Sequence, residues 1–402
     1  MFPCYLNVVK KNYDVLIIGA GAAGNAVASK IRNAETLVIE KKKIIGEPAE
    51  CAGLVSKNCI DIMGFKDERF IQNEIYGAYI HSPEGQEYHI GGDKLHAYAI
   101  DRVEFDRLLA EKGKENGADY LLGVRAERVA RGEKGITVKT KGEEFECNIL
   151  VGAEGIDSIT RRTFFGYEPE EVLFGIGAEV ENIDVDPRNV HVFFGNKLAP
   201  GFFAWIIPTS RKGKSARIGL CTTYPSPYPS KKLLHNLLNY PTTRPFLENI
   251  DIIKVIAGRI PLGYIRESAE DNVMLIGDSA FQVKPVSGGG VYPIAISSEA
   301  CAVTIEKALE EKNFSKRILK RYHEMWSSKL KKEIVLGMWV RRFFNKLKDD
   351  EIEKLLAHLK REDVIETINM YGDMDHPSKL ILPLCRRIPS LLSLLPRFLT
   401  LF

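Results

Sequence analysis

The chain has 402 residues, 45% of them hydrophobic, which is enough apolar material for a large core and for two or more domains. Its 56 Lys and Arg against 53 Asp and Glu leave a net charge of only +3, so no bulk electrostatic field favours a nucleic-acid partner. Seven scattered cysteines without a CxxC pair disfavour a disulfide framework and exclude a dense metal or iron–sulfur ligand run. We therefore expect a reducing compartment and no metal site.

The sequence shows neither a targeting segment nor a membrane span. Residues 1–14 (MFPCYLNVVKKNYD) lack an apolar core of signal-peptide length. No stretch offers the roughly 18 uninterrupted apolar residues that a membrane-spanning helix requires. We therefore expect a cytoplasmic protein, or one that contacts a membrane peripherally from the cytoplasmic side.

Residues 13–40 predict a strand, a glycine-rich turn, a helix and a second strand. The apolar residues 15–18 lead into a GxGxxG pattern, and the second strand ends on an acid that can accept both hydroxyls of an adenosine ribose. The first glycine allows a tight turn, the second lets the backbone approach a pyrophosphate, and the third lets helix and strand pack closely. The expected dinucleotide contacts are Gly19, Gly21, Ala22, Ala23, Gly24 and Glu40.

Two residues of the following segment could take part in chemistry. Lys41 begins a lysine run that is either a phosphate contact or, more commonly, a solvated loop. Cys51 lies in a Gly/Pro/Ala-rich stretch without a core-like apolar pattern. It is either a small buried residue, as free cysteines often are, or a reactive one.

Residues 75–118 predict a hairpin, then a strand and a helix. Residues 75–90 alternate around a Pro-Glu-Gly turn, which is typical of an antiparallel hairpin inserted into the nucleotide domain. Residues 96–118 then read as a strand, Asp101 as the N-cap, and an amphipathic helix. Arg102 at the helix start either reaches cofactor phosphates or is an ordinary surface arginine.

Residues 119–221 are mostly β-type. Three strand-like runs over residues 119–152 end in Ala153, Glu154 and Gly155, where small residues would let the backbone pass close to a cofactor. Further on, residues 200–208 (PGFFAWIIP) form an aromatic stretch between two prolines. This stretch is either an ordinary buried strand or the wall of an apolar pocket.

A third glycine-bearing motif follows the apolar strand at residues 273–276. Open α/β sheets bind ligands at the carboxyl ends of their strands, which is where this motif begins. A carboxylate there suits a polyhydroxyl chain, because an ionised carboxylate only accepts hydrogen bonds. A long helix then opens with unpaired N–H groups that can face an anion. The residues concerned are Gly277, Asp278, Pro285, Gly288, Gly289 and Gly290.

The C-terminal part is expected to be helical. Residues 314–360 are helical and heavily charged, and residues 377–402 alternate leucine-rich runs with arginines. Prolines at 383, 389 and 396 forbid one continuous span. The tail is a helical cap on the core, a dimer contact or an interfacial membrane element.

Taken together, the three motifs resemble the p-hydroxybenzoate-hydroxylase class of FAD proteins over residues 13–310. In that class the middle motif carries Asp-Gly, where this chain has Glu154-Gly155. The resemblance implies FAD in a Rossmann-type domain, with substrate over the isoalloxazine on an antiparallel sheet. It also implies FAD contacts at Lys41, Arg102, Val124 and Ala153.

Within that class the chain resembles the geranylgeranyl reductases, specifically the archaeal digeranylgeranylglycerophospholipid reductases. Residues 47–56 (EPAECAGLVS) resemble their cysteine-bearing loop. Residues 200–208 resemble their P-x-[EY-type]-x-W-x-F-P signature, although two phenylalanines replace the acidic and tyrosyl residues. This makes the pocket more apolar, which suits a polyprenyl chain. The implied substrate contacts are Phe202, Phe203, Trp205 and Pro208.

The implied fold is α/β with an α+β insertion: a Rossmann-type FAD-binding domain, an antiparallel-sheet substrate domain and a helical C-terminal region. We expect residues 1–70, 96–170 and 265–312 to form the FAD-binding domain. Residues 71–95 and 171–264 would form the substrate sheet, and residues 313–402 the helical region.

The implied activity is the saturation of isolated C=C bonds in geranylgeranyl chains of archaeal membrane-lipid precursors. An isolated alkene has no carbonyl to accept charge, so we expect protonation at one carbon as hydride reaches the other. Aromatic faces of Phe202, Phe203 and Trp205 could stabilise the tertiary cationic character by about 2 kcal/mol. Cys51 is the candidate proton donor.

Three rival functions remain on sequence grounds. A flavin monooxygenase or halogenase uses the same scaffold, and residues 203–208 come within one residue of the halogenase W-x-W-x-I-P pattern. A relative of electron-transfer-flavoprotein:quinone oxidoreductase would need a C-terminal four-cysteine cluster, but only Cys385 lies beyond residue 301. A non-catalytic flavoprotein or lipid-binding scaffold is the third. The electron donor stays open among NADPH, ferredoxin and other reductants.

Overall fold

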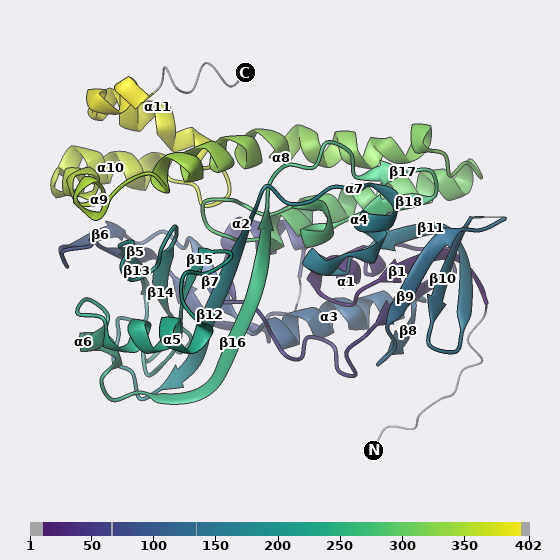
Figure 1. The fold of residues 1–402 in the computed structure, drawn as a ribbon, viewed down its shortest axis with the longest axis horizontal. Coiled ribbons are helices and arrows are strands. Elements are labelled where there is room, and N and C mark those ends of the chain that lie inside the picture. The colour runs from purple at the N-terminus through teal and green to yellow at the C-terminus, as the bar shows by residue number, and fades with distance from the viewer. Residues whose placement is uncertain (1–10, 66, 134, 395–402) are drawn as a thin grey trace.

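The computed structural model describes residues 11–65, 67–133 and 135–394. Three β-sheets and a set of C-terminal helices make up the described chain (Figure 1). The sheet that contains the strand at residues 12–18, which we call the glycine-motif sheet, lies on the right in Figure 1. The long antiparallel sheet, which contains most strands of residues 171–262, lies on the left, and the C-terminal helices run along the top. This is the α/β fold with an antiparallel sheet and a helical C-terminal region that the sequence predicts.

The first sheet has eight strands and a parallel centre. Its strands are β1 (Asn12–Ile18), β2 (Thr36–Glu40), β8 (Asp119–Leu122), β9 (Ala126–Arg131), β10 (Ile136–Thr140), β11 (Glu144–Gly152), β17 (Ala269–Glu270) and β18 (Val273–Leu275). Their order is β17-β18-β11-β1-β2-β8, with β10 and β9 added beside β11. Parallel pairing brings Ile18 at the end of β1 beside Ile39 and Gly152. The carboxyl ends of β1, β2 and β11 therefore meet at one edge of the sheet.

The second sheet has seven strands and contains the aromatic stretch. Its strands are β5 (Gly77–His81), β6 (Glu87–Gly91), β12 (Glu171–Glu181), β13 (Asn189–Phe194), β14 (Phe203–Pro208), β15 (Ser215–Thr223) and β16 (Asp251–Leu262), in the order β16-β12-β15-β14-β13-β5-β6. The antiparallel β5–β6 pair confirms the predicted hairpin, and β5 joins the later strands through a parallel pairing with β13. Helices α5 (Ser230–Asn239) and α6 (Arg244–Leu247) cover one face.

A small third sheet lies next to the segment that carries Cys51. It consists of β3 (Leu54–Ser56), β4 (Ile71–Ile75) and β7 (Ala97–Ile100), in the order β3-β7-β4. Helix α2 (Lys57–Met63) follows β3, and helix α3 (Arg102–Glu115) follows β7. The Asp101 carboxylate accepts from the N–H groups of Val103 and Glu104 at 2.9 and 3.1 Å. Asp101 is therefore the N-cap that the sequence predicts.

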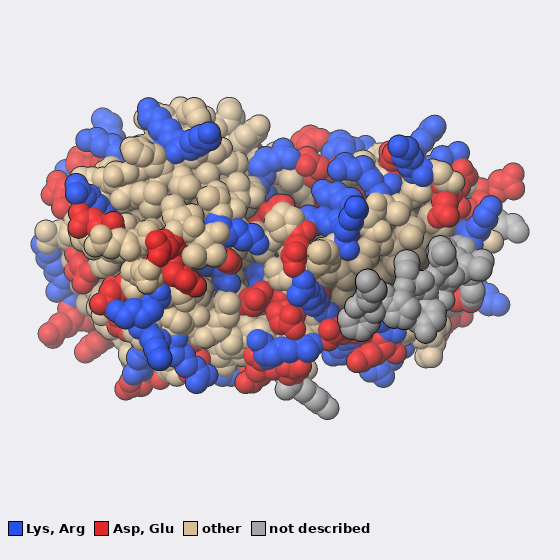
Figure 2. Space-filling model, turned by 90° about the horizontal axis from the view of Figure 1, so that it is seen from below, with Lys and Arg blue, Asp and Glu red and all other residues tan. Residues whose placement is uncertain are grey.

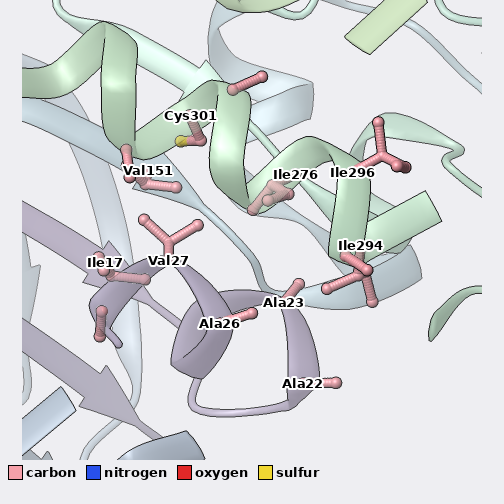
Figure 3. Close-up of a cluster of buried hydrophobic side chains, with 14 of the residues drawn as sticks. Ile17, Ala22, Ala23, Ala26, Val27, Val151, Ile276, Ile294, Ile296 and Cys301 are labelled. Carbon is pink, nitrogen blue, oxygen red and sulfur yellow. The ribbon is translucent and has the colours of Figure 1, made fainter. Parts of the chain in front are cut away.

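The main core lies between the first sheet and two helices, α1 (Ala22–Ala28) and α7 (Val291–Glu310). Every residue of α1 is buried, because its small side chains let the helix fit closely between β1 and α7. Figure 3 shows Ala23 of α1 beside Ile294 of α7, and Val27 beside Val151 of β11. This packing holds the glycine turn firmly against the carboxyl edge of the sheet.

The C-terminal region consists of α8 (Lys316–Phe344), α9 (Asp349–Leu356), α10 (Glu362–Tyr371) and α11 (Ser378–Arg387). Pro383 lies inside α11, so this proline does not end the helix. Among the described helices none is both long and apolar enough to cross a membrane. The last part of the leucine-rich tail, residues 395–402, lies outside the described residues.

One detail differs from the sequence prediction. Residues 119–152 form four strands rather than three, because the short strand β8 adds to the edge beside β2. On the face seen in Figure 2, Lys and Arg are interspersed with Asp and Glu, in keeping with the small net charge.

Candidate functional site

The glycine turn of residues 19–24 is packed on one side and open on the other. Gly19 has φ +107°, and a Cβ there would lie 2.4 Å from the Ala153 carbonyl oxygen. A Cβ on Gly24 would lie 1.9 Å from the Gly19 carbonyl oxygen, so α1 can approach β1 only without a side chain at this position. The Cβ position of Gly21 has nothing within 4 Å. The turn thus leaves room for a ligand against its backbone.

Glu40 ends β2 beside this turn and is 8% exposed. Its carboxylate accepts from the Ala20 N–H at 2.7 Å and from the Lys42 N–H at 2.8 Å. The Val124 N–H donates to the Glu40 carbonyl at 2.9 Å, so Val124 lies at the same edge. Lys41 is exposed. Glu40 keeps lone pairs that ribose hydroxyls could use, whereas Lys41 lies at the periphery.

The second motif begins where β11 ends beside β1. The Ala153 N–H donates to the Ile18 carbonyl at 2.9 Å, and Gly155 has φ +78° with nothing within 4 Å of its Cβ position. The Glu154 carboxylate accepts from the side chain and the N–H of Thr160 at 2.5 and 3.0 Å, at the start of helix α4 (Ile159–Phe164). Glu154 is therefore engaged in capping a helix. What this motif offers to a ligand is its backbone.

The third motif contacts both of the others. A Cβ on Gly277 would lie 2.8 Å from the Ala23 Cβ of helix α1. The Ser279 hydroxyl accepts from the Gly155 N–H at 3.1 Å and donates to the Gly155 carbonyl at 3.2 Å. The three motifs that the sequence separates by more than a hundred residues are therefore adjacent in space.

Asp278 lies between these contacts, and no described residue donates a hydrogen bond to its carboxylate. Burial raises the pKa of Asp278 to about 6, and the positive charges of Arg102 and Arg161 oppose this rise. A partly buried carboxylate without donors is a strong acceptor for ligand hydroxyl groups.

The loop at residues 284–290 connects Asp278 with the antiparallel sheet. A Cβ on Gly290 would lie 3.5 Å from Asp278 Oδ1, and a Cβ on Gly288 would lie 3.7 Å from Phe202 Cζ. Pro285 packs against Gly337 of α8, where a Cβ would lie 2.9 Å from its ring. The loop thus lies between Asp278 and the aromatic stretch.

Cys51 and Arg102 line a cavity of about 290 Å³ between the Cys51 segment, the start of α3 and strands β12 and β15. The Arg102 guanidinium pairs with Asp106 at 3.1 Å and interacts electrostatically with Cys51. Burial disfavours its charge, but Asp106 and Cys51 outweigh burial and raise the pKa of Arg102. The Arg102 Nε atom is buried without a hydrogen-bond partner. Arg102 is therefore an interior group rather than a surface arginine.

A larger cavity lies elsewhere. It measures about 660 Å³ and is an outer groove between α7 and α8. Charged side chains such as Glu306, Lys307 and Arg321 line it, and it contains none of the motif residues. Cavity size therefore does not locate the site in this chain, whereas the convergence of the motifs does.

The aromatic side chains of residues 202–205 gather beside the loop. Phe202 and Phe203 stack with ring centroids 4.3 Å apart, and the Arg341 guanidinium lies 5.1 Å from the Phe202 centroid. Arg341 is itself paired with Glu171 at 2.6 Å. Both faces of Phe202 are thus covered within the protein, which leaves Phe203 and Trp205 as the aromatic groups better placed to face a ligand.

Trp205 lies on the face of β14 away from α5 and α6. A Cβ on the neighbouring Gly219 would lie 2.5 Å from Trp205 Cζ2, so the glycine makes room for the indole. The Trp205 Nε1 atom is buried without a hydrogen-bond partner. Successive residues of a strand alternate between faces, so Pro208 shares the opposite face with Ile206. The expected grouping of Pro208 with Trp205 therefore does not hold.

Three side chains on β5, β6 and β13 of the second sheet form a group that could bind a metal ion. Ligand atoms of His81, Glu87 and His191 lie within 4.8 Å of one another. His81 Nε2 and His191 Nδ1 are 2.9 Å apart and share a hydrogen bond. Burial lowers the pKa of His81 to about 3 and that of His191 to about 4, so both rings are neutral near pH 7. Composition and local spacing give no hint of this pair, because pairing of β5 with β13 brings the two histidines together.

The arrangement of the three motifs fits FAD. The backbone at Gly21 and Gly155 is open, Asp278 lacks a donor, and Arg102 Nε lacks an acceptor. A dinucleotide supplies phosphate and carbonyl acceptors for the arginine and the amides, and hydroxyl donors for the carboxylates. Sequence reasoning missed two charged side chains beside these residues, Arg341 and Asp375. No local motif marks either of them, since their partners lie far away in the chain.

Comparison with known proteins agrees with this fit. The family model described as "FAD binding domain" matches residues 12–324. A solved structure described as a geranylgeranyl bacteriochlorophyll reductase-like protein from Thermoplasma acidophilum superimposes with a TM-score of 0.83. It covers 96% of this chain and 99% of its own, at 21% identity, and so shows the fold.

Two curated relatives cover most of the chain. An uncharacterised protein of Methanocaldococcus jannaschii is 32% identical over 380 residues, 92% of this chain and 94% of the relative. Digeranylgeranylglycerophospholipid reductase 2 of Methanopyrus kandleri is 27% identical over 89% of this chain and 92% of the relative. The chain therefore belongs to the FAD binding domain family, and FAD is its cofactor.

Proposed function

We propose that the protein is an FAD-dependent reductase that saturates the isolated C=C bonds of geranylgeranyl chains in digeranylgeranylglycerophospholipids, the precursors of archaeal membrane lipids. The observation that carries the proposal is the position of the aromatic stretch. Phe202 lies beside the loop at Gly288, where an added Cβ would be 3.7 Å from its ring, and the same loop approaches Asp278 at Gly290. An apolar aromatic wall one loop away from the cofactor contacts suits a polyprenyl chain. The relatives named as reductases support this choice of substrate.

We divide the chain into a cofactor-binding domain, a lipid-binding domain and a helical region. As far as the structure describes them, we assign residues 1–70, 96–170 and 265–312 to the FAD-binding domain and residues 313–402 to the helical region. Residues 71–95 and 171–264 would form the domain that binds the lipid, although β4 at residues 71–75 pairs with β7 in the small third sheet. The support for this division is that the β5–β6 hairpin pairs with the strands of residues 171–262 and not with the glycine-motif sheet.

The residues that hold the cofactor come from all three motifs and the edge beside them. Backbone groups at Gly19, Gly21 and Gly155 receive the phosphates, and Glu40 and Asp278 accept from hydroxyl groups. Arg102 supplies its free Nε donor. The full proposed set is Gly19, Gly21, Ala22, Ala23, Gly24, Glu40, Arg102, Val124, Ala153, Glu154 through its backbone, Gly155, Gly277, Asp278, Pro285, Gly288, Gly289 and Gly290.

Reduced FAD supplies a hydride when bound. The chain's own residues must then deliver a proton to the other alkene carbon and stabilise the cationic character that develops. Cys51 is the proposed donor, because its sulfur lies in a cavity beside Arg102, whose positive charge stabilises the sulfur after the proton leaves. Trp205 and Phe203 offer aromatic faces to the cation.

The test uses the purified holoenzyme under anaerobic conditions. The flavin is reduced with dithionite, digeranylgeranylglyceryl phospholipid is added, and flavin reoxidation and lipid mass are followed together. Reoxidation with a gain of two hydrogens per saturated bond is expected. A reduced flavin that leaves the lipid mass unchanged would contradict the proposal.

The alternative is an FAD-dependent monooxygenase or halogenase with the same fold. The near match of residues 203–208 to the halogenase pattern favours it, with Phe203 in place of the first tryptophan. In that case the reduced flavin would react quickly with oxygen, and hydroxylated or halogenated product would form. The Cys51 segment has no role in that chemistry, which ranks it second.

The lipid substrate implies contact with a membrane surface, which we place on α10 and α11. Met370 is 72% exposed and Leu382 is 58% exposed, and the basic residues Arg386 and Arg387 follow on α11. Exposed apolar side chains with adjacent cations are typical of an interfacial helix on anionic lipid. Co-sedimentation with anionic vesicles should fall for Leu382→Glu and remain for the distant variant Ile253→Glu. Equal co-sedimentation of both variants would refute this surface.

A further inference from the structure

The loop between α10 and α11 reaches back to two segments of the proposed site. Its Asp375 is 2% exposed. One carboxylate oxygen accepts from Lys284 Nζ at 2.8 Å, and the other accepts from Ser56 Oγ at 2.7 Å. Lys284 Nζ also donates to the Met374 carbonyl at 3.0 Å. One buried acid thus joins the C-terminal region to two distant parts of the chain.

Asn58 Nδ2 at the start of α2 is a third, longer donor to this carboxylate, at 3.4 Å. The two closer partners, Lys284 and Ser56, each belong to a segment of the proposed site. Lys284 begins the loop at residues 284–290, where its carbonyl accepts from the Gly288 N–H at 2.8 Å and its N–H donates to the Gly289 carbonyl at 3.0 Å. Ser56 ends β3 directly after the Cys51 segment, and its hydroxyl also caps α2 by accepting from the Cys59 N–H at 3.1 Å. Asp375 therefore fixes the loop and the Cys51 segment relative to each other.

The ion pair is an expensive way to stabilise a fold. The Lys284 side chain is 15% exposed and the Asp375 side chain is 1% exposed, so both charges are largely desolvated. Apolar residues of similar volume often stabilise a protein as well as a buried ion pair does, whereas an ion pair imposes a defined geometry. A role in positioning accounts for the pair better than a role in stability alone.

Further contacts keep the loop that carries Asp375 in place. The Tyr292 hydroxyl in the first turn of α7 lies 3.2 Å from His376 Nε2. Ser378, at the start of α11, donates from its hydroxyl to Glu333 of α8 at 2.5 Å. The C-terminal helices are thus anchored at the start of α7, next to the loop at residues 284–290.

We propose that Asp375 is a positioning residue of the redox site, which sets the distance between the Cys51 segment and the loop at residues 284–290. The proposal rests on the proposed function only in assigning these two segments to the flavin and lipid. The linkage itself is a property of the protein with or without cofactor.

The test compares Asp375→Asn with Asp373→Asn. Asp373 lies in the same loop, where its carboxylate accepts from the N–H groups of Asp375 and His376 and pairs with His376 and Lys379, but it does not contact Ser56 or Lys284. Both variants lose one negative charge, so the comparison separates loss of the contacts to Ser56 and Lys284 from loss of charge in the loop. Hydrogen–deuterium exchange is followed in the protein without FAD, in residues 52–57 and 284–290. Asp375→Asn should lose protection in both segments, and Asp373→Asn in neither.

With FAD bound, the kcat of Asp375→Asn should fall by about tenfold or more with KM within about twofold, since small misplacements at a reacting centre are costly. The midpoint potential of its flavin should also differ from wild type, while Asp373→Asn matches wild type. Unchanged exchange in both segments, or an unchanged potential and kcat, would overturn the proposal. The exchange result does not involve lipid, so a protein that fails to reduce lipid would refute the proposed function and leave this inference standing.

Two milder variants keep the proposal testable if Asp375→Asn does not fold. Lys284→Gln should release residues 284–290 and leave residues 52–57 protected, and Ser56→Ala should do the reverse. Release of neither segment, or equal release of both by each variant, would contradict a linkage through Asp375.

Discussion

The dinucleotide end and the lipid end of the proposed site are built from different materials. The dinucleotide end consists of backbone at three glycine-bearing strand ends, and each motif is continuous in sequence. The lipid end consists of side chains that meet only in the fold, such as Trp205 from β14 and Arg341 from α8. Asp375 also belongs to this end, and it lies 319 positions after its partner Ser56 in the chain.

This difference predicts different responses to substitution. A backbone cradle fails when a side chain is added, because the new Cβ either clashes with packed backbone, as at Gly24, or fills the open side that the ligand uses, as at Gly21. A wall of side chains fails when their chemistry changes, while the fold tolerates the change.

Gly24→Ala should destabilise the protein by about 3 kcal/mol, because overpacking at a backbone contact forces helix and strand apart. The added Cβ would lie 1.9 Å from the Gly19 carbonyl oxygen. Urea denaturation of the protein without FAD measures the loss.

The matched control is Gly21→Ala, which has an ordinary φ of −82° and nothing within 4 Å of the new Cβ. Its stability without FAD should stay within about 0.5 kcal/mol of wild type. Its FAD affinity should fall, since the new methyl group occupies the open side of the turn. Normal FAD binding by Gly21→Ala would show that the phosphates lie elsewhere.

Cys51→Ala should lower kcat by about 100-fold, which is the typical loss when a proton donor is removed. FAD affinity should change much less than kcat, because Cys51 reaches the cofactor contacts only through Arg102. Single-turnover reoxidation of the reduced enzyme by lipid measures the step directly. Activity within about twofold of wild type would remove Cys51 from the chemistry.

Trp205→Leu should lower kcat by about 30-fold if an aromatic face contributes about 2 kcal/mol to a desolvated cation. Trp205→Phe keeps an aromatic ring and should lose much less. The same single-turnover assay compares the two variants. Equal losses in both would indicate that Trp205 acts by filling the space over Gly219 and not through its aromatic face.

The sequence predicts the dinucleotide end well, for a physical reason. Local backbone geometry requires Gly19 and Gly24, and Gly21 leaves the turn open to a ligand, so the spacing of the three residues carries the information. The hairpin at residues 75–90 and the Asp101 cap are also local, and both are confirmed. Glu154 is the exception within this end, since its carboxylate caps α4 and only the fold reveals that.

The lipid end could be predicted only in part. The sequence shows which residues are aromatic, but not which face of the strand each lies on or what covers its ring. Strand alternation separates Pro208 from Trp205, and Arg341 covers Phe202 from another helix. From the sequence, Arg102 is either a cofactor contact or an ordinary surface arginine. Its burial and its interactions with Asp106 and Cys51 show that it is not a surface arginine. Side-chain environments depend on tertiary packing, which no local pattern encodes.

The smallest predicted effect is the pH dependence of FAD binding at the dinucleotide end. Burial raises the pKa of Asp278 to about 6, so the carboxylate is ionised above pH 6 and protonated below it. If FAD hydroxyls donate to the ionised form, one proton competes with FAD, and the dissociation constant should rise about tenfold from pH 7 to pH 5. Fluorescence titration of the flavin measures this change.

Asp278→Asn should remove this pH dependence, because an amide does not titrate. Without FAD the raised pKa acts in the opposite direction: the folded protein holds the proton more tightly than the unfolded chain, so stability falls as pH rises from about 4 to 6. Asp278→Asn should flatten that part of the stability curve as well. A variant that changes one dependence and not the other would separate the burial of Asp278 from its contact with FAD.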